Sequence, residues 1–384
     1  MFLTSRVPFP LEKGDKLRAY HQMKTMSKRH DVYLISLGEE PLTEAAKEEL
    51  TTFCSEVWVY HSSFLSRVFN IIVSWWSGHP FQVGYFFNAG ADLFVKRKIA
   101  KIAPDHIFVQ LVRMAEYVKG INHLPKSLDY MDSFSTGMLR RKEKEQSWKK
   151  VFFDWEYKRL ANYERAVFKH FNHHFIISEQ DRDSMDLPEK DQILIIPNGV
   201  DDAFFQANAQ EATHELLFTG NMSYAPNVAA VCTIVNDILP LVWEKLPHCK
   251  LMIAGANPSP EVKALEGKNV TVTGWLDDIR TAYHSGMICL APLDIGTGLQ
   301  NKLLEAMSME LPCITSSLTN NALGATHGKE IIITDTPEES AAAVVDLLQH
   351  EAKRVQIGKA GKEFVKATYN WEAISLQLEK EMGL

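Results

Sequence analysis

The residues best suited to chemistry in this chain are concentrated in segment 287–317, MICLAPLDIGTGLQNKLLEAMSMELPCITSS. Its apolar start predicts a buried strand, and Gly296, Thr297 and Gly298 predict a flexible turn. An amphipathic helix is predicted to begin near Leu299. The first turn of a helix presents unpaired backbone amides, which bind anions. The segment therefore predicts an anion site.

Within that predicted helix, Gly298, Lys302 and Glu305 are spaced as i, i+4 and i+7 and would share one stripe, apart from a core-facing stripe of leucines. At about 1.5 Å per residue, Gly298 and Glu305 would lie roughly 10 Å apart, the span of a pyrophosphate and a ribose. The glycine end would hold a diphosphate, Lys302 would neutralise it, and Glu305 would accept hydrogen bonds from ribose hydroxyls. The alternative is an exposed Lys302–Glu305 ion pair, worth a few tenths of a kcal/mol.

Two further turns carry glycine and polar residues after predicted strands. Gly220 and Asn221 follow the strand ELLFT, and Asn227 is a candidate cap for the next helix. Gly14 and Asp15 lie in the loop after the first strand of the chain. Both turns are candidates for contact with the same ligand, although a strand-to-helix turn often carries glycine for steric reasons alone.

Strands ending at KLMIAGA and VTVTGW would finish at the same sheet edge as the predicted anion site. Trp275 and the backbone of Leu276 are therefore candidates for holding a nucleotide base, and Gly255 is a candidate for contact with the same ligand. The adjacent Asp277 and Asp278 are more typical of a helix start than of a metal site.

We predict no metal site and no cofactor. The histidines form no HExxH pattern, no cluster has the spacing of hard-cation ligands, and GxSxG is absent. The five cysteines form no CxxC pair and no disulfide framework, which indicates a reducing compartment. Hydrolase chemistry based on a nucleophilic side chain is disfavoured.

The 384 residues suggest about two domains. A formal net charge of −7 argues against a nucleic-acid partner. The amino-terminal residues lack a long apolar core of the signal-peptide kind, and no apolar run reaches the roughly 18 residues of a membrane span. A cytoplasmic location is the default expectation.

Strands and helices alternate along both halves of the chain, which predicts an α/β protein with parallel sheets covered on both faces. The alternation breaks at ILIIPNGVDDAFF and restarts near Glu215. We therefore predict two doubly wound, Rossmann-like domains, residues 1–198 and 199–367, facing a central cleft that binds a ligand.

A strongly apolar and aromatic helix is predicted around residues 64–76, with Trp75 and Trp76 near its end. A buried helix is the favoured interpretation, and a peripheral position at the inner face of a membrane is the alternative. The basic clusters 96–101 and 139–150 could attract anionic lipid head groups in the second case.

Five pieces occur in the order of a known family: IPNGVDDAFF, FTGNMSYAPN, MIAGANP, VTVTGWLDDIR and APLDIGTGLQNKLLEAMSMELPCITS. The pieces RVPFPLEKGDKLRAYH at the start and GLQNKLLEAM near the end match one subgroup of that family. In this respect the chain resembles GT-B glycosyltransferases of family four, and within them bacterial sugar transferases associated with exopolysaccharide gene clusters. The resemblance spans nearly the whole chain, and the ordered set is more specific than any one motif.

The resemblance implies a GT-B fold whose carboxyl-terminal helix, about residues 368–384, packs back on the first domain. It implies a UDP- or GDP-type nucleotide-sugar donor bound mainly by the second domain, a lipid-linked or polysaccharide acceptor, and metal-independent transfer with retention at the anomeric carbon.

Residue by residue, Glu305 matches the carboxylate that binds the donor ribose, and Lys302 matches a basic residue of the subgroup. The diphosphate turn is matched by Gly298, Leu299, Gln300 and Asn301, and Gly14 matches the amino-terminal glycine loop. The family's paired glutamates stand eight positions apart, and this chain has Thr297 at the first position. A hydroxyl thus replaces a carboxylate that commonly contacts the sugar.

Two alternatives stay open. A GT-B sugar-nucleotide epimerase would need acid and base groups, for which Asp15, Asp129 and Asp132 are available. A catalytically silent GT-B subunit, binding only nucleotide or a partner, is suggested by Thr297 alone.

Overall fold

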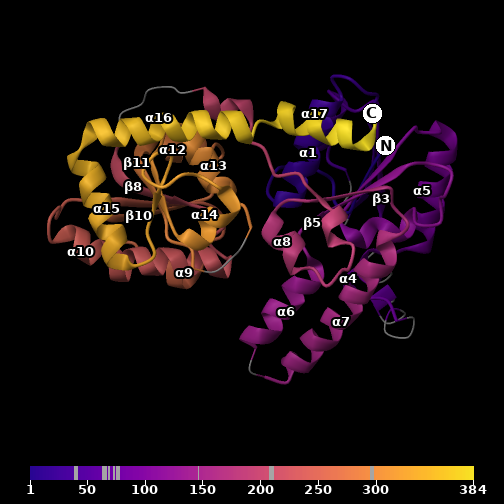
Figure 1. Ribbon diagram of the computed structural model, residues 1–384, viewed down its shortest axis with the longest axis horizontal. Helices are drawn as coiled ribbons and strands as arrows, with labels where there is room; N and C mark the ends of the chain where they lie inside the picture. Colours follow the sequence, from indigo (N-terminus) through magenta and orange to yellow (C-terminus); the bar gives the residue numbers. More distant parts are fainter. Residues whose placement is uncertain are drawn as a thin grey trace. The chain divides into compact units, whose positions relative to one another are not determined.

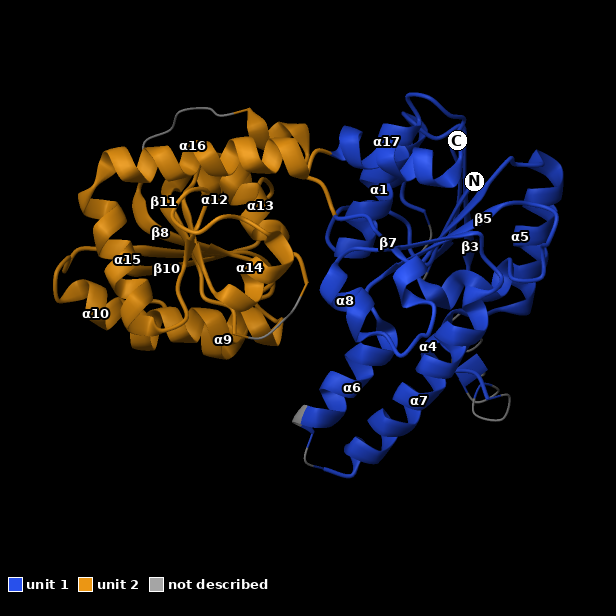
Figure 2. Cartoon of the chain, in the orientation of Figure 1, with its two compact units in different colours: residues 1–197, 371–384 blue, residues 198–370 orange. Residues whose placement is uncertain are grey.

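The computed structural model describes residues 1–38, 42–62, 67, 70–71, 74, 78–145, 147–206, 212–294 and 298–384. The chain divides into two compact units (Figure 2). Unit 1 comprises residues 1–197 and 371–384, and unit 2 comprises residues 198–370. The division follows Pro197, one residue before the boundary predicted from the break in the alternation.

Unit 1 contains a seven-stranded sheet in the order β3-β2-β1-β4-β5-β6-β7, with parallel pairing throughout. The central strands β1 and β4 are buried along their whole length, as expected for a parallel sheet covered on both faces. The strands are β1 (Phe2–Thr4), β2 (Tyr33–Gly38), β3 (Glu56–His61), β4 (Ile107–Gln110), β5 (Lys126–Met131), β6 (His173–Ile176) and β7 (Leu194–Ile195).

The helices of unit 1 cover this sheet, and two of them form a long hairpin that extends from it (Figure 1). The hairpin consists of α6 (Phe134–Lys144) and α7 (Lys149–Phe168). The others are α1 (Gly14–Met26), α2 (Glu44–Thr51), α4 (Phe81–Phe86), α5 (Ala89–Ile102), η1 (Val112–Tyr117), α8 (Glu179–Ser184), η2 (Lys190–Gln192) and α17 (Trp371–Met382).

Helix α17 returns from the end of unit 2 and packs on α1 of unit 1. Its apolar face, Trp371, Ile374 and Leu378, enters the core that α1 covers. Arg29 binds Glu379 through two nitrogens, Nε and Nη2, each 2.8 Å from a carboxylate oxygen. The last helix is thus an integral part of unit 1.

Unit 2 contains a six-stranded parallel sheet in the order β10-β9-β8-β11-β12-β13. Its buried residues form one cluster that includes the apolar runs of β8, β9 and β11. The strands are β8 (His214–Thr219), β9 (Leu251–Ala254), β10 (Val270–Gly274), β11 (Gly286–Ala291), β12 (Cys313–Thr315) and β13 (Ile332–Ile333).

Helices cover both faces of this sheet, with α9 on one side and α13 and α16 on the other (Figure 1). The helices are η3 (Asp202–Phe205), α9 (Ala225–Thr233), the π-helical turn η4 (Ile234–Ile238), α10 (Leu239–Trp243), α11 (Pro260–Lys263), α12 (Arg280–Ser285), α13 (Asn301–Ser308), α14 (Ser317–Leu323), α15 (Pro337–Gln349) and α16 (Glu351–Thr368). The predicted α/β class with two Rossmann-like domains is confirmed.

One continuous helical stretch, 225–243, has the length and mean hydropathy of a membrane span, 19 residues at 1.5. It carries Val231, Ile234 and Ile238 into the core of unit 2. Because its apolar face is already covered by the sheet, this stretch is a core helix of the unit.

The apolar pattern of segment 338–358, EESAAAVVDLLQHEAKRVQIG, predicts one helix, whereas the structure divides it into α15 and α16 at His350, whose backbone leaves the helical region at φ −118° and ψ 80°. No glycine or proline marks this break in the sequence. Trp75 and Trp76 of the predicted aromatic helix lie outside the described residues.

Candidate functional site

The strand order of unit 2 reverses between β8 and β11. From β8 the chain proceeds outward to β9 and β10, whereas β11 leads to β12 and β13 on the other side. In doubly wound sheets, ligands bind beyond the carboxyl ends of the strands at such a reversal. The loops that follow β8 and β11 are the two glycine-bearing turns singled out in the sequence, at Gly220 and at Gly298.

Two glycines allow close backbone packing at this edge. Gly220 has φ +154° and Gly255 has φ +141°, conformations that other residues adopt rarely. A Cβ on Gly220 would lie 2.6 Å from Nδ2 of Asn227, and one on Gly255 would lie 1.8 Å from the carbonyl oxygen of Gly220. These glycines shape the edge by permitting the approach of β8 and β9.

Replacing Gly255 by alanine should therefore destabilise unit 2 by about 2 kcal/mol, because the new Cβ meets immovable backbone in a strained conformation. Thermal unfolding measures this change. Gly267→Ala is the matched control, since nothing lies within 4 Å of its added Cβ. Equal melting temperatures for the two variants would contradict the assigned packing.

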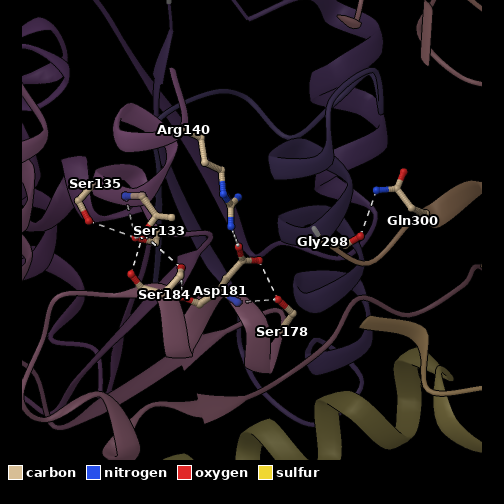
Figure 3. A network of polar contacts seen from close by, with 9 residues as sticks. Ser133, Ser135, Arg140, Ser178, Asp181, Ser184, Gly298 and Gln300 are labelled. Atoms are coloured by element: carbon tan, nitrogen blue, oxygen red, sulfur yellow. Dashed lines mark hydrogen bonds and ion pairs between the residues drawn. The ribbon is translucent and has the colours of Figure 1, made fainter. Parts of the chain in front are cut away.

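The start of α13 lies beside this reversal. The helix begins at Asn301, two residues later than predicted, so Gly298 and Leu299 precede it and Gly298 does not share a helical stripe with Lys302. Gln300 occupies the cap position without capping the helix, because its side chain donates to the carbonyl of Gly298 at 3.0 Å (Figure 3). Gly296 and Thr297 lie outside the described residues.

The first turn of α13 also holds a buried polar atom that has no hydrogen-bond partner among the described residues. Oδ1 of Asn301 accepts no hydrogen bond within the described part of the chain. Backbone amides without a side-chain cap and an unsatisfied polar side chain at the same helix start are suited to receive an external ligand.

Lys302 is more buried than a residue on a polar stripe would be, with 9 % of its area exposed. Its Nζ donates to Oδ1 of Asn227 at 2.6 Å and lies 4.2 Å from the ring centroid of Phe218. Burial lowers the pKa of Lys302 to about 8, against an opposing effect of nearby Glu305. The ammonium is therefore a cation held at the strand reversal with little water around it.

Asn227 is not the predicted helix cap. Tyr224 occupies the cap position of α9, and Asn227 lies in the first turn. Its Nδ2 donates to the carbonyl of Asn221 at 2.9 Å while its Oδ1 binds Lys302. Asn227 thus joins the loop after β8 to the helix after β11.

Glu305 lies one turn further along α13 and is partly buried. Its Oε2 accepts a hydrogen bond from the hydroxyl of Tyr283 at 2.7 Å, and that hydroxyl lies 2.8 Å from Oγ1 of Thr219 at the end of β8. Withdrawal from water raises the pKa of Glu305 to about 7, although the Tyr283 bond and Lys302 act in the opposite direction. No ion pair links Lys302 and Glu305 in the described chain, so the simple surface pair is not formed.

Tyr283→Phe removes the donor that holds Glu305 in place and favours its ionised form. We expect nucleotide affinity at pH 7.5 to fall several-fold, and the lower pH limit of binding to move upward, because the pKa of Glu305 would rise further. Calorimetry with UDP across pH measures both changes. An unchanged pH profile would remove Tyr283 from the site.

The predicted base-binding residues differ in their surroundings. The side chain of Trp275 is largely exposed, and its Nε1 donates to Oδ1 of Asp277 at 3.3 Å. Leu276 packs against the core of unit 2. Asp278 forms a salt bridge with Arg280 at 2.7 Å and accepts from its backbone amide, as expected at a helix start.

Unit 1 has its own strand reversal, between β1 and β4. Asp15, at the start of α1, accepts a hydrogen bond from Arg6 at 2.6 Å and lies 3.6 Å from Nη2 of Arg113. Gln110 donates to the carbonyl of Asp15. The carboxylate of Asp15 is therefore engaged by two arginines, whereas Gly14 has open space around its Cα.

Hydroxyl-bearing side chains in the segments that follow β5 and β6 of unit 1 form a network of polar contacts (Figure 3). Ser133 caps α6, and Ser178 caps α8 by accepting from the amide of Asp181. Asp181 in turn accepts from the hydroxyl of Ser178 at 2.7 Å and lies 3.7 Å from Arg140. These contacts fix the loops after β5 and β6.

The carboxylates that an epimerase could use as acid and base differ in their burial. Asp129 is fully buried and bound to Nε of Arg18 at 2.6 Å, which leaves it unsuited to proton transfer with a ligand. Asp132, beyond the end of β5, is exposed.

Sequence reasoning missed Tyr283 and Thr219 and misassigned Asn227. These three side chains position the predicted Lys302 and Glu305, and the hydrogen bonds that do so join residues between 19 and 75 positions apart in the chain. Neither periodicity nor a local motif could reveal such contacts.

Comparison with known proteins finds one family match and one relative of similar length. Residues 213–350, which lie within unit 2, match the family model of glycosyl transferases group 1. An uncharacterised 44.6 kDa protein in the cps region of Klebsiella pneumoniae is 20 % identical over 386 residues, which cover 97 % of each chain.

Solved structures show that the fold is GT-B. A sucrose-phosphate synthase from Thermosynechococcus elongatus superposes with a TM-score of 0.67 at 15 % identity, covering 99 % of this chain and 97 % of its own. Anabaena HepE in complex with UDP and glucose superposes with a TM-score of 0.68 at 12 % identity, covering 100 % and 98 %. The likeness extends over both units.

Proposed function

We propose that this protein is a retaining, metal-independent glycosyltransferase that moves a sugar from a UDP- or GDP-type donor to a lipid-linked or polysaccharide acceptor in exopolysaccharide synthesis. The match of unit 2 to glycosyl transferases group 1 and the UDP bound by HepE support a nucleotide-sugar donor. The relative in the Klebsiella cps region supports the proposed pathway class.

The observation that carries the proposal is that α13 presents both Lys302 and Glu305 at the strand reversal of unit 2, each held by its own hydrogen bond. A buried ammonium and uncapped amides suit a diphosphate, and the nearby carboxylate suits ribose hydroxyls. We assign Gly298, Leu299, Gln300 and Asn301 to the diphosphate, and Gly220, Asn221, Gly255, Trp275 and Leu276 to the remainder of the nucleotide.

In transfer, the bond between the anomeric carbon and the diphosphate breaks and negative charge develops on the leaving oxygen. Lys302 and the amides of α13 would stabilise that charge without rearrangement, which is the main source of catalysis in such reactions. The acceptor hydroxyl would attack on the face that the diphosphate leaves, and a phosphate oxygen would take its proton. Unit 1 would bind the acceptor.

Thermal unfolding with UDP, GDP and ADP tests donor binding, because a nucleotide that binds only the folded state raises the melting temperature. We expect UDP or GDP to stabilise the protein and ADP to have little effect. Incubation of the matching sugar nucleotide with lipid-linked acceptor should then release nucleoside diphosphate. Formation of a new sugar nucleotide without that release would identify an epimerase, and binding without any turnover would identify a silent subunit.

Transfer is expected to survive EDTA, since Lys302 and helix amides would supply the positive charge that a divalent cation supplies elsewhere. The measurement is nucleoside diphosphate release before and after chelation. Complete loss that Mg²⁺ restores would contradict this assignment.

A further inference from the structure

The turn end of the α6–α7 hairpin in unit 1 exposes large apolar side chains. Trp148 is 79 % exposed and Val151 is 73 % exposed, the two highest values among large apolar residues in the described chain. Figure 1 shows the hairpin extending from the sheet of unit 1. Such side chains at the end of a protruding element are unusual unless something covers them.

These residues belong to one continuous stripe of α7. Trp148, Val151, Phe152 and Trp155 are spaced as i, i+3, i+4 and i+7 and therefore share a helical face. At its inner end, Trp155 and Phe152 pack on Phe81 of α4, with ring centroids 5.2 and 5.5 Å apart. The stripe thus begins in a packed aromatic cluster and continues, uncovered, to the turn.

The charge around the stripe is positive. Residues 139–159 contain eight lysines and arginines against four acidic residues, in a chain of formal net charge −7. Of these acids, Asp154 is already paired with Lys142 and Lys158, and Glu156 is buried. Lys149 and Lys150, next to Trp148, are exposed. The end of the hairpin is therefore both apolar and basic.

We propose that the hairpin tip, defined as Trp148, Lys149, Lys150 and Val151, docks on an anionic phospholipid bilayer. Tryptophan favours the membrane interface, and lysines beside it are attracted to acidic head groups. A second copy of the chain is a poorer occupant, because pairing two tips would bring four lysines together. The inference concerns a different surface from the nucleotide site and does not depend on the proposed transfer.

Flotation with vesicles of phosphatidylglycerol and phosphatidylcholine, compared with phosphatidylcholine alone, tests the proposal. The protein should float only with the anionic vesicles, and less at high salt. Trp148→Ser with Val151→Ser should lower partitioning about tenfold or more, and Lys149→Gln with Lys150→Gln should do the same. Because all four side chains are exposed, the variants should keep the melting temperature of the unaltered protein.

Matched controls come from the same unit. Leu93→Ser with Leu376→Ser removes two side chains that are 51 % and 48 % exposed, and Lys96→Gln with Lys101→Gln removes charge from the other basic cluster. Neither pair should change flotation. No flotation of the unaltered protein, or an equal loss in a control pair, would overturn the proposal, as would self-association that the Trp148 and Val151 changes abolish. UDP stabilisation, measured in parallel, reports separately on the proposed function.

Discussion

Replacing Lys302 by methionine is expected to lower the rate of sugar transfer about 100- to 1,000-fold, the loss found when one donor to a developing negative charge is removed. The side chain is buried, and its Nζ is placed by Asn227 and Phe218 beside the start of α13. Methionine keeps the apolar stem of the lysine and deletes the charge. The measurement is the steady-state rate of nucleoside diphosphate release.

The melting temperature of Lys302→Met shows whether a loss of activity comes from damage to the fold. Burial lowers the pKa of Lys302 to about 8, which means that folding disfavours its charged form. Lys302→Met should therefore leave the melting temperature unchanged or raise it while activity falls, the opposite of what damage to the fold would produce. Lys359→Met on the exposed face of α16 is the control and should alter neither property. Near-normal turnover by Lys302→Met would remove Lys302 from the mechanism.

The two-unit α/β architecture could be predicted from the sequence because most of its strands are short apolar runs that lead into a turn. The position of the site depends on where the strand order reverses, and this in turn depends on which strands pair. Strand pairing is a long-range property that no local sequence pattern shows. Even so, the turns at Gly220 and Gly298 were recognisable from their glycines, and at Gly220 an added Cβ would lie 2.6 Å from Nδ2 of Asn227.

Side-chain partners were the part that could not be predicted. The helical stripe placed Lys302 on an open polar face, and the structure buries it because Asn227, 75 residues earlier, lies over it. Asn227 in turn resembles a helix cap when only its neighbours are considered, although its amide joins the loop after β8 to Lys302 of α13. Contacts of this kind depend on the assembled sheet, and a local pattern carries no information about them.

Glu305→Gln is expected to weaken UDP binding about 10- to 100-fold at pH 8, because hydrogen bonds to a charged acceptor contribute roughly 1.5–3 kcal/mol. Glutamine keeps the size of the side chain, and its amide oxygen can still accept the hydrogen bond from Tyr283. The variant therefore removes the charge and leaves the position of the side chain unchanged. Calorimetry measures the affinity. Glu363→Gln, an exposed carboxylate on α16, should have no effect.

The pH dependence of binding distinguishes the two charged groups of the site. The pKa of Glu305 is raised to about 7, so its carboxylate is lost as pH falls through 7, and affinity for UDP should fall with it. The pKa of Lys302 is lowered to about 8, so its ammonium is lost as pH rises through 8, and affinity should fall there too. Glu305→Gln should abolish the acidic limb and keep the alkaline limb, and Lys302→Met should do the reverse. If Glu305→Gln still loses affinity for UDP at low pH, another group must be responsible for that loss, and the proposed role of Glu305 in binding ribose would be wrong.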